Sequence, residues 1–368
     1  MALLSRGKRP LPGGWGVVST GSIAHAFAED LAHSDDAHIR AVCSRDASRA
    51  AAFAAAHSGA APNGKLRSIR PYDDLDAMLD DPVVEMVYVA SVNSAHRDMV
   101  MRVLEAGKPV LCEKPLATNA EDAEEMARMA RRHRTLLMEA LWTRHLPAVK
   151  AARRHLEAGR IGRLVAVRGG LGKRRPFDPG SRLFDPKLGG GSILDLGIYP
   201  ISLAILFAHH PDRVEGKWWA NAAGSDSRAT IRLTCGIGDG AVDVQLACGF
   251  TDDLRNRFVL QGTRGAIVLD DTLRPTKLTL HGRPLERLPD PARAEPMSAR
   301  LTRWLGSGKS GTVEKHAFDG NGLRLQAERM AQCVRDGLTE CPEVPLSETV
   351  EALRVVDAVR REPPTARV

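Results

Sequence analysis

Short apolar segments alternate with amphipathic helices through the first 140 residues of this 368-residue chain. The apolar segments are residues 14–19, 39–43, 83–90 and 110–113, and the segments with helical spacing are residues 23–31, 47–57, 97–106 and 121–134. This alternation predicts a parallel sheet covered by helices, because parallel neighbours need a crossover connection, which is usually a helix. Ligands bind at the carboxyl edge of such a sheet. The residues that follow these strands are therefore the first candidates for a functional site.

The first strand runs directly into a tight turn and a helix, an arrangement that suits phosphate. The free N–H groups and the positive dipole at the start of a helix attract a pyrophosphate. The dinucleotide fingerprint G-x-G-x-x-G/A is incomplete, because Ser19 stands at its first glycine. The motif fits a Rossmann dinucleotide-binding domain, but an incomplete fingerprint does not by itself identify one. Its candidate cofactor contacts are Ser19, Thr20, Gly21, Ser22, Ile23 and Ala24.

The second strand ends in Ser44 and Arg45, where an NAD enzyme usually presents an acidic residue to the ribose hydroxyls. A guanidinium donates charge-assisted hydrogen bonds to a phosphate, so this pair suits the 2′-phosphate of NADP. We therefore predict NADP as the cofactor, with NAD as the alternative. The competing interpretation is that Ser44 caps the helix at 47–57 and Arg45 faces water.

Another apolar strand, Val110 to Cys112, ends in Glu113-Lys114-Pro115. A Lys-Pro step cannot extend the strand, so the ammonium of Lys114 lies at the carboxyl edge of the sheet. We predict that Lys114 is catalytic. The alternative is a solvated lysine at the end of a strand.

A second pair of candidates follows the run of three glycines at 189–191. Ser192 reads as the N-cap of a helix from Ile193 to Phe207, whose spacing places Asp195 and Tyr199 on one face. A neighbouring Lys114 ammonium would favour the phenolate of Tyr199, whose unperturbed pKa is about 10. We predict that Asp195 and Tyr199 are catalytic. The alternative is a buried tyrosine on an apolar helix and an aspartate that caps a loop.

The pattern changes near residue 141. Alternating strands at 164–169, 229–234, 241–248, 257–261 and 266–269 predict a mainly antiparallel sheet with helices on one side. The predicted fold class is therefore α/β: a Rossmann domain at 1–141, followed by an α+β domain at 142–345 with a large open sheet.

The strand-turn-helix start, the loop at 91–96 and Glu113-Lys114-Pro115 together resemble the glucose-fructose oxidoreductase, inositol dehydrogenase and rhizopine-catabolism (Gfo/Idh/MocA) family. Within it, the chain looks most like the dimeric dihydrodiol dehydrogenases and the NADP-dependent D-xylose dehydrogenases, whose opening also carries serine for the first glycine. The runs that carry the resemblance span nearly the whole chain: residues 15–19, the Ser-x-Asn-x-x-His loop at 91–96, Glu113-Lys114-Pro115, and residues 137–144, 182–186, 189–199 and 320–322.

The resemblance implies an NADP-dependent dehydrogenase that oxidises a sugar or trans-dihydrodiol hydroxyl by hydride transfer, or runs the reverse reduction. In that expectation Lys114 and Tyr199 handle the proton and Asp195 orients the hydroxyl. Further cofactor contacts would be Ser91, Asn93, His96, Glu113 and Lys114, and the substrate would meet Glu139, Trp142 and Arg144. The resemblance also implies a homodimer formed by the open sheet face, and a last helix, 346–361, that returns to the nucleotide domain.

Two other functions remain open. One is a glycosidase of the same family that retains its nicotinamide cofactor. The other is a catalytically silent sensor of nicotinamide and sugar, against which the intact Lys114, Asp195 and Tyr199 argue.

Composition and short motifs narrow the possible partners, location and metal content of the protein. The net charge of +7 comes mostly from scattered arginines without lysine tracts, which argues against nucleic acid and favours mild attraction for anions. Six cysteines without C-x-x-C spacing predict reduced thiols and a cytoplasmic protein, and there is no run of 18 apolar residues. His209-His210 lacks further ligands at metal spacing, so we predict no metal. Residues 306–310 imitate a phosphate loop without its first glycine, within a segment, 283–315, that we expect to be an irregular excursion.

Overall fold

The computed structural model describes residues 13–60, 66–294 and 311–366. The first half forms a parallel sheet of six strands: β1 Gly14–Val18, β2 His38–Cys43, β5 Arg70–Tyr72, β6 Met86–Val89, β7 Val110–Glu113 and β8 Leu137–Ala140. Their spatial order, β5-β2-β1-β6-β7-β8, reverses direction at β1, as in a Rossmann fold. All five pairings are parallel, which confirms the prediction from alternating strands and helices. A short ribbon, β3 Gly59–Ala60 with β4 Leu66–Arg67, lies apart from this sheet.

Five helices connect these strands: α1 Ser22–Leu31, α2 Ala47–His57, α3 Leu75–Asp80, α4 His96–Glu105 and α5 Ala120–His133. The four central strands bury almost every side chain, because helices cover both faces of the sheet. Asp46 caps α2 by accepting hydrogen bonds from the N–H groups of Ser48 (2.9 Å) and Arg49 (3.3 Å). The interpretation of Ser44 as this cap is therefore wrong.

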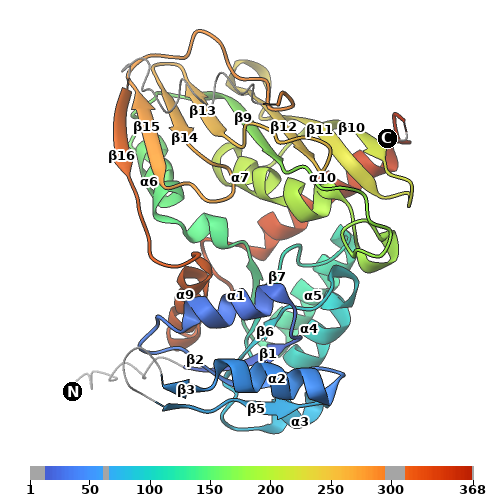
Figure 1. The fold of residues 1–368 in the computed structure, drawn as a ribbon. Coiled ribbons are helices and arrows are strands. Elements are labelled where there is room, and N and C mark those ends of the chain that lie inside the picture. The colour runs from blue at the N-terminus through green and yellow to red at the C-terminus, as the bar shows by residue number, and fades with distance from the viewer. Residues whose placement is uncertain (1–12, 61–65, 295–310, 367–368) are drawn as a thin grey trace, which may run out of the picture.

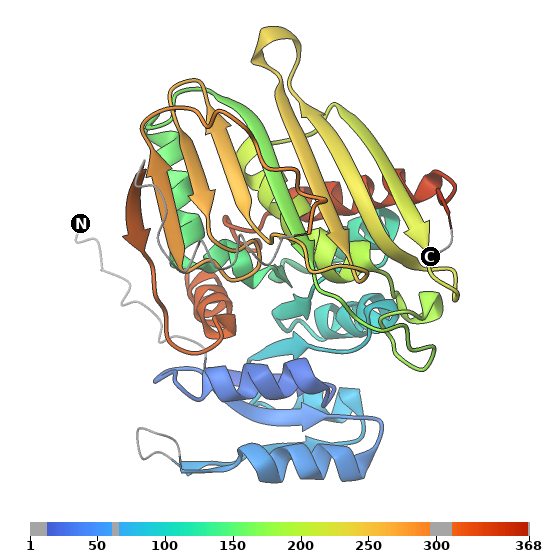
Figure 2. The ribbon, with the colours of Figure 1, turned by 45° about the horizontal axis from the view of Figure 1, so that its top comes forward.

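The second half forms an eight-stranded sheet: β9 Leu164–Gly172, β10 Arg213–Ala220, β11 Asp226–Cys235, β12 Val242–Gly249, β13 Phe258–Gly262, β14 Ala266–Leu269, β15 Lys277–His281 and β16 Gly311–Lys315. The order is β10-β11-β12-β9-β13-β14-β15-β16, and every pairing is antiparallel except β9 with β12. Figure 2 shows helices behind one face of this sheet and an open face toward the viewer. The predicted mainly antiparallel open sheet is thus confirmed. Strand β16 lies inside the segment expected to be irregular, so that expectation is wrong at this end; residues 306–310 lie outside the described residues.

Three helices lie behind the second sheet, and one of them, α10, joins the two halves of the molecule. They are α6 Pro147–Glu157, α7 Ile198–Ala208 and α10 Leu346–Arg361, while α9 Leu323–Arg335 packs against α1. Helix α10 contacts α5 and β8 of the first half and α7 and β10 of the second (Figure 1). The segment Pro186–Ala208 is long and apolar enough to cross a membrane, but 89% of its most apolar window is buried in the protein, as in a core helix.

Candidate active site

The turn between β1 and α1 has the backbone geometry of a dinucleotide-binding turn. Ser19 adopts a φ of 86°, the left-handed conformation that glycine supplies in the fingerprint. Gly21 precedes α1 without a side-chain cap, and no acidic residue stands in the first turn. The first N–H groups of a helix have no partner within it. Ser19 therefore takes the backbone conformation of the glycine that it replaces, and the uncapped start of α1 is available to a phosphate.

Two buried hydroxyls at this edge of the sheet lack a protein partner. Thr20 Oγ1 lies in the turn and Ser91 Oγ lies just after β6, and neither has a hydrogen-bond partner among the described residues. A buried hydroxyl without a partner is unfavourable, so such atoms indicate a ligand or water. The position of both at the carboxyl edge, beside β1, fits a bound dinucleotide.

The end of β2 presents a free cation beside this turn. Arg45 is exposed, and within the described residues it has no ion pair, while Ser44 is half-buried and accepts a long hydrogen bond from the Asp46 N–H (3.4 Å). Because Asp46 caps α2, both Ser44 and Arg45 remain available for a ligand. The residues present therefore fit a dinucleotide with a phosphate near Arg45.

Lys114 directly follows β7 and is held by Asp195, which lies just before helix α7. Its Nζ donates to the backbone oxygen of Asp195 at 2.7 Å and to Asp195 Oδ1 at 3.3 Å. The same Nζ lies 4.9 Å from the ring centroid of Tyr199. The side chains of Lys114 and Asp195 are 13% and 14% exposed, so they are shielded but reachable. The structure thus brings together the three residues predicted to be catalytic.

Asp195 lies in a single π-helical turn, η4 Ile193–Gly197, which precedes α7. Such turns within helices are frequent at functional sites. Tyr199 is the second residue of α7, and its hydroxyl accepts a hydrogen bond from Trp142 Nε1 at 3.0 Å. The indole N–H of Trp142 donates to the hydroxyl oxygen of Tyr199. The hydrogen of that hydroxyl is not used in this bond and can be donated to a substrate. Sequence reasoning gave no signal for this contact between Trp142 and Tyr199, which are 57 residues apart.

The charges of the site are set by burial and by Lys114. Burial raises the pKa of Tyr199 to about 12, and the Lys114 ammonium offsets only part of that effect. Burial also raises the pKa of Asp195, but Lys114 and Arg182 outweigh it and hold the pKa below its ordinary value. Burial lowers the pKa of Lys114, yet the Tyr199 phenolate, once it forms, and the Asp195 carboxylate raise that pKa above its ordinary value. Lys114 favours the phenolate as expected, but burial has the larger effect on the pKa of Tyr199. At neutral pH the site therefore holds a carboxylate, an ammonium and a protonated phenol.

Two predicted substrate contacts, Glu139 and Arg144, are internal supports. Glu139 is fully buried, and its carboxylate accepts from the Leu116 N–H (3.0 Å) and from Thr349 Oγ1 (2.8 Å). The side chain of Arg144 is 2% exposed and donates to Ser202 and Glu348. Both groups are committed to protein partners, so the structure does not support their direct contact with substrate. Trp142 is 8% exposed, and its contact with substrate remains a prediction.

His96, Asn93 and Glu113 also hold neighbouring segments. His96 has no exposed surface, and its ring nitrogens face the carbonyl oxygens of Pro115 (2.8 Å) and Ser91 (3.1 Å). Direct contact of His96 with the cofactor is therefore not supported. Asn93 Nδ2 donates to the Gly189 carbonyl at 2.9 Å, and Glu113 accepts from the Tyr88 hydroxyl at 2.5 Å. Their contacts with cofactor remain predictions.

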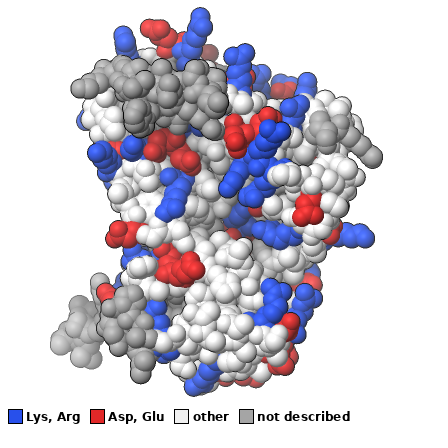
Figure 3. Space-filling view, viewed as in Figure 1, with Lys and Arg blue, Asp and Glu red and all other residues white. Residues whose placement is uncertain are grey.

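Two arginines near Asp195 were not predicted as site residues, although Arg182 begins one of the runs that carry the family resemblance, residues 182–186. Arg175 and Arg182 lie between β9 and the glycine run, and both lower the pKa of Asp195. Their segment is an irregular loop with no periodic pattern, so only the tertiary structure places them. Figure 3 shows basic side chains beside the waist between the two lobes. The described residues contain no cluster of three or more potential metal ligands.

Comparison with known proteins agrees with this geometry. Residues 14–141 match the family model "Oxidoreductase family, NAD-binding Rossmann fold", and residues 149–268 match "GFO/IDH/MocA C-terminal domain". The chain is 31% identical to the human trans-1,2-dihydrobenzene-1,2-diol dehydrogenase and 33% identical to that of Macaca fascicularis, covering 94% of this chain and 96% of each relative.

Solved structures share the whole fold. A 3-ketoreductase from Actinomadura kijaniata, in complex with NADP and TDP-benzene, superposes with a TM-score of 0.76 at 23% identity over 97% of this chain and 99% of that chain. An aldose-aldose oxidoreductase from Caulobacter crescentus, complexed with glycerol, gives a TM-score of 0.75 at 20% identity over 95% and 96% of the two chains. These likenesses show the fold, and the dehydrogenase relatives show the family. The chain belongs to the Gfo/Idh/MocA family and is an NAD(P)-dependent oxidoreductase, similar over nearly its whole length to dehydrogenases of trans-dihydrodiols.

Proposed function

We propose that this protein is an NADP-dependent dehydrogenase that interconverts a hydroxyl and a carbonyl on a sugar, such as a D-xylose-like aldose, or on a trans-dihydrodiol. The observation that supports this most is the contact of Lys114 with Asp195 beneath the ring of Tyr199, at the carboxyl edge of the parallel sheet. The names of the dehydrogenase relatives and of the sugar-handling structural neighbours support the substrate class.

The proton chemistry follows from the protonation states of the site. In the reductive direction, the Tyr199 phenol donates its proton to the substrate oxygen, and the Lys114 ammonium stabilises the phenolate that remains. Asp195 holds Lys114 in place and orients the substrate hydroxyl. In the oxidative direction the substrate hydroxyl gives its proton back to that phenolate. When bound, the nicotinamide supplies or accepts the hydride at the substrate carbon.

The proposed choice of NADP rests on Arg45 and Ser44 at the end of β2. An exposed guanidinium without an ion pair among the described residues can donate two charge-assisted hydrogen bonds to a 2′-phosphate. An acidic residue, which an NAD enzyme would use, follows only at Asp46, where it caps α2. The pairing of two copies through the open sheet face and a cytoplasmic location are further predictions of the resemblance and of the buried thiols.

A substrate screen tests the proposal. Aldoses, polyols and trans-dihydrodiols would be mixed with NADP⁺ or NAD⁺, and the absorbance of the reduced cofactor followed, with Lys114→Ala as the matched inactive control. We expect turnover of at least one class, with NADP⁺ preferred. Glycoside cleavage by a protein that keeps its cofactor through dialysis, without external turnover, would support the glycosidase instead. Cofactor binding without any turnover would support the silent sensor.

A further inference from the structure

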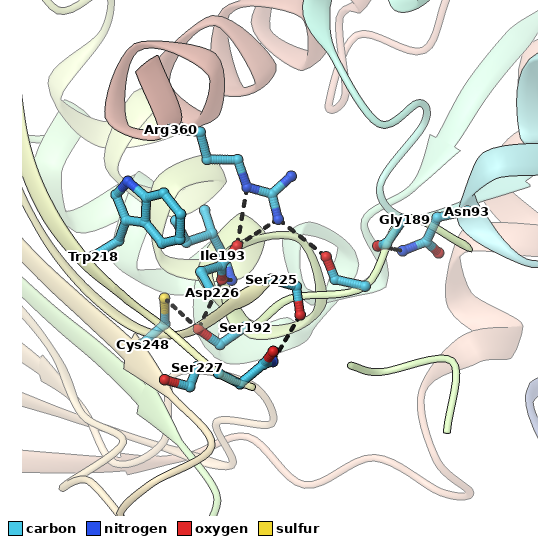
Figure 4. Close-up of polar contacts among 12 residues, drawn as sticks. Asn93, Gly189, Ser192, Ile193, Trp218, Ser225, Asp226, Ser227, Cys248 and Arg360 are labelled. Atoms are coloured by element: carbon cyan, nitrogen blue, oxygen red, sulfur yellow. Dashed lines mark hydrogen bonds and ion pairs between the residues drawn. The ribbon is translucent and has the colours of Figure 1, made fainter. Parts of the chain in front are cut away.

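A buried carboxylate outside the proposed catalytic group holds the turn that presents Asp195. Asp226, at the start of β11, has a side chain that is 1% exposed. Its Oδ2 accepts hydrogen bonds from Ser192 Oγ (3.0 Å) and the Ile193 N–H (2.6 Å), so Asp226, rather than the predicted Ser192, caps the catalytic helix. Its Oδ1 accepts from Arg360 Nε (3.0 Å) and Nη2 (2.5 Å). Figure 4 shows Asp226 between the turn and Arg360.

The glycine run at 189–191 is shaped around this pair. Gly191 adopts a φ of 121°, and a Cβ there would lie 2.4 Å from Asp226 Oδ1 and 2.6 Å from Arg360 Nη2. Arg360 Nη2 also donates to the Gly190 carbonyl at 3.2 Å. On the other side of the turn, Asn93 from the loop after β6 donates to the Gly189 carbonyl (Figure 4). The turn is thus clamped between the last helix and the loop beside the proposed cofactor site.

The other end of the same helix supports the Lys114 loop. Thr349 Oγ1 of α10 donates to Glu139 Oε2 at 2.8 Å, and Glu139 Oε1 accepts the N–H of Leu116 at 3.0 Å, two residues after Lys114. Thr349 and Arg360 are eleven residues apart, which is close to three helical turns, so both lie on one face of α10. That face spans about 16 Å between the two positions.

We propose that α10 is a strut that sets the distance between Lys114 and the Asp195–Tyr199 pair. Thr349 acts through Glu139 on the loop of Lys114, and Arg360 acts through Asp226 on the turn before Asp195. Thr349, Glu139, Asp226 and Arg360 are positioning residues for the proton transfer, and this role rests on the proposed function. The proton transfer depends on the spacing of these groups, because a displacement of about 1 Å at an active site can lower the rate about a hundred-fold.

Two conservative variants test the strut. Arg360→Ala would leave the buried Asp226 carboxylate without its cation and endanger folding, so Arg360→Lys is used, which keeps the charge but loses the two-pronged contact. Thr349→Val removes the hydroxyl and keeps the shape of the side chain. Arg361→Lys, at the exposed next position, is the matched control. We expect kcat to fall about ten- to a hundred-fold in the first two variants, with cofactor affinity changed less than about two-fold.

Two further readouts separate positioning from general destabilisation. Each substitution is combined with Tyr199→Phe, and a positioning residue should then lose most of its effect, because the group it positions has gone. Hydrogen exchange of residues 189–197, which requires no turnover, should be faster in Arg360→Lys than in Arg361→Lys. Wild-type exchange and wild-type kcat in both variants would overturn the strut, and so would a loss of kcat that persists unchanged in the Tyr199→Phe background. If the wild-type protein turns over no CH–OH substrate, the proposed function fails, and the exchange rates alone then decide whether α10 holds the turn.

Discussion

Replacing Tyr199 by phenylalanine removes one hydroxyl from the centre of the site and keeps the ring. The ring packs edge-on against Trp142, with centroids 6.3 Å apart and planes at 81°, and lies 4.9 Å from Lys114 Nζ. Phenylalanine preserves both contacts. What is lost is the acceptor for Trp142 Nε1 and the proton that the mechanism transfers.

The structure predicts effects of different size on stability and on turnover. Trp142 Nε1 would be left buried without a partner, which costs about 1–3 kcal/mol of the free energy of unfolding. Loss of the acid–base group should lower kcat about 10²- to 10⁴-fold, while cofactor affinity stays nearly unchanged. Tyr72→Phe is the matched control, because its hydroxyl donates to Asp81 (2.6 Å) at the edge of the first sheet, far from Lys114. It should lose stability and keep turnover.

The pH profile adds a second check on the same variant. Because burial raises the pKa of Tyr199 to about 12, the phenolate is a minor form at pH 7 in the ligand-free protein. The rate of alcohol oxidation should therefore rise with pH across the range in which the protein stays folded, and this rise should vanish in Tyr199→Phe. Steady-state rates in both directions, with thermal unfolding measured in parallel, test both statements. A Tyr199→Phe protein with more than about a tenth of the wild-type kcat would refute the role of Tyr199 as the proton donor.

Lys114→Ala should fold and bind cofactor but lose about 10²- to 10⁴-fold in kcat, and Lys114→Arg should keep more activity because a fixed cation still stabilises the phenolate; the reverse order in kinetic assays would make Lys114 the direct acid–base group. Arg45→Ala should weaken NADP binding about ten- to a hundred-fold and leave NAD binding unchanged by calorimetric titration, because charge-assisted hydrogen bonds contribute about 1.5–3 kcal/mol; equal losses for both cofactors would exclude the 2′-phosphate contact. Burial raises the pKa of Glu139 from 4.5 to about 7, so the folded protein favours the protonated carboxyl group. The stability that this preference adds is fully present below about pH 4.5 and is lost as the pH rises through 7. That difference in pKa corresponds to about 3 kcal/mol of unfolding free energy, and Glu139→Gln should lose correspondingly less stability between pH 5 and 9 in denaturant titrations. Equal pH dependence of stability in the two proteins would show that Glu139 does not titrate there.

Local patterns in the sequence identified four of the six strands of the first sheet, five of the eight strands of the second sheet and the catalytic candidates. Alternating segments predicted the parallel sheet because hydrophobic periodicity reports directly on which faces are buried. Lys114 could be placed at the carboxyl edge because a proline ends its strand, and helical spacing put Asp195 and Tyr199 on one face. Ser19 shows the limit of a motif, since the fingerprint looked broken although the backbone keeps the φ of 86° that glycine provides.

The buried residues that hold the catalytic groups in place could be recognised only from the tertiary structure. Glu139 and Arg144 stood in a run that marks the site, but their role follows from partners such as Thr349, which is 210 residues away from Glu139. The cap of the catalytic helix comes from Asp226, 34 residues beyond Ser192, and its counter-ion lies another 134 residues along the chain. The sequence alone therefore determined most of the central strands of both sheets and the groups that stand at their ends, because these follow from periodicity within a few residues. Only the folded chain decided which buried polar groups meet, and hence the charge state of Tyr199, because burial and long-range partners are set by packing between segments that no local pattern connects.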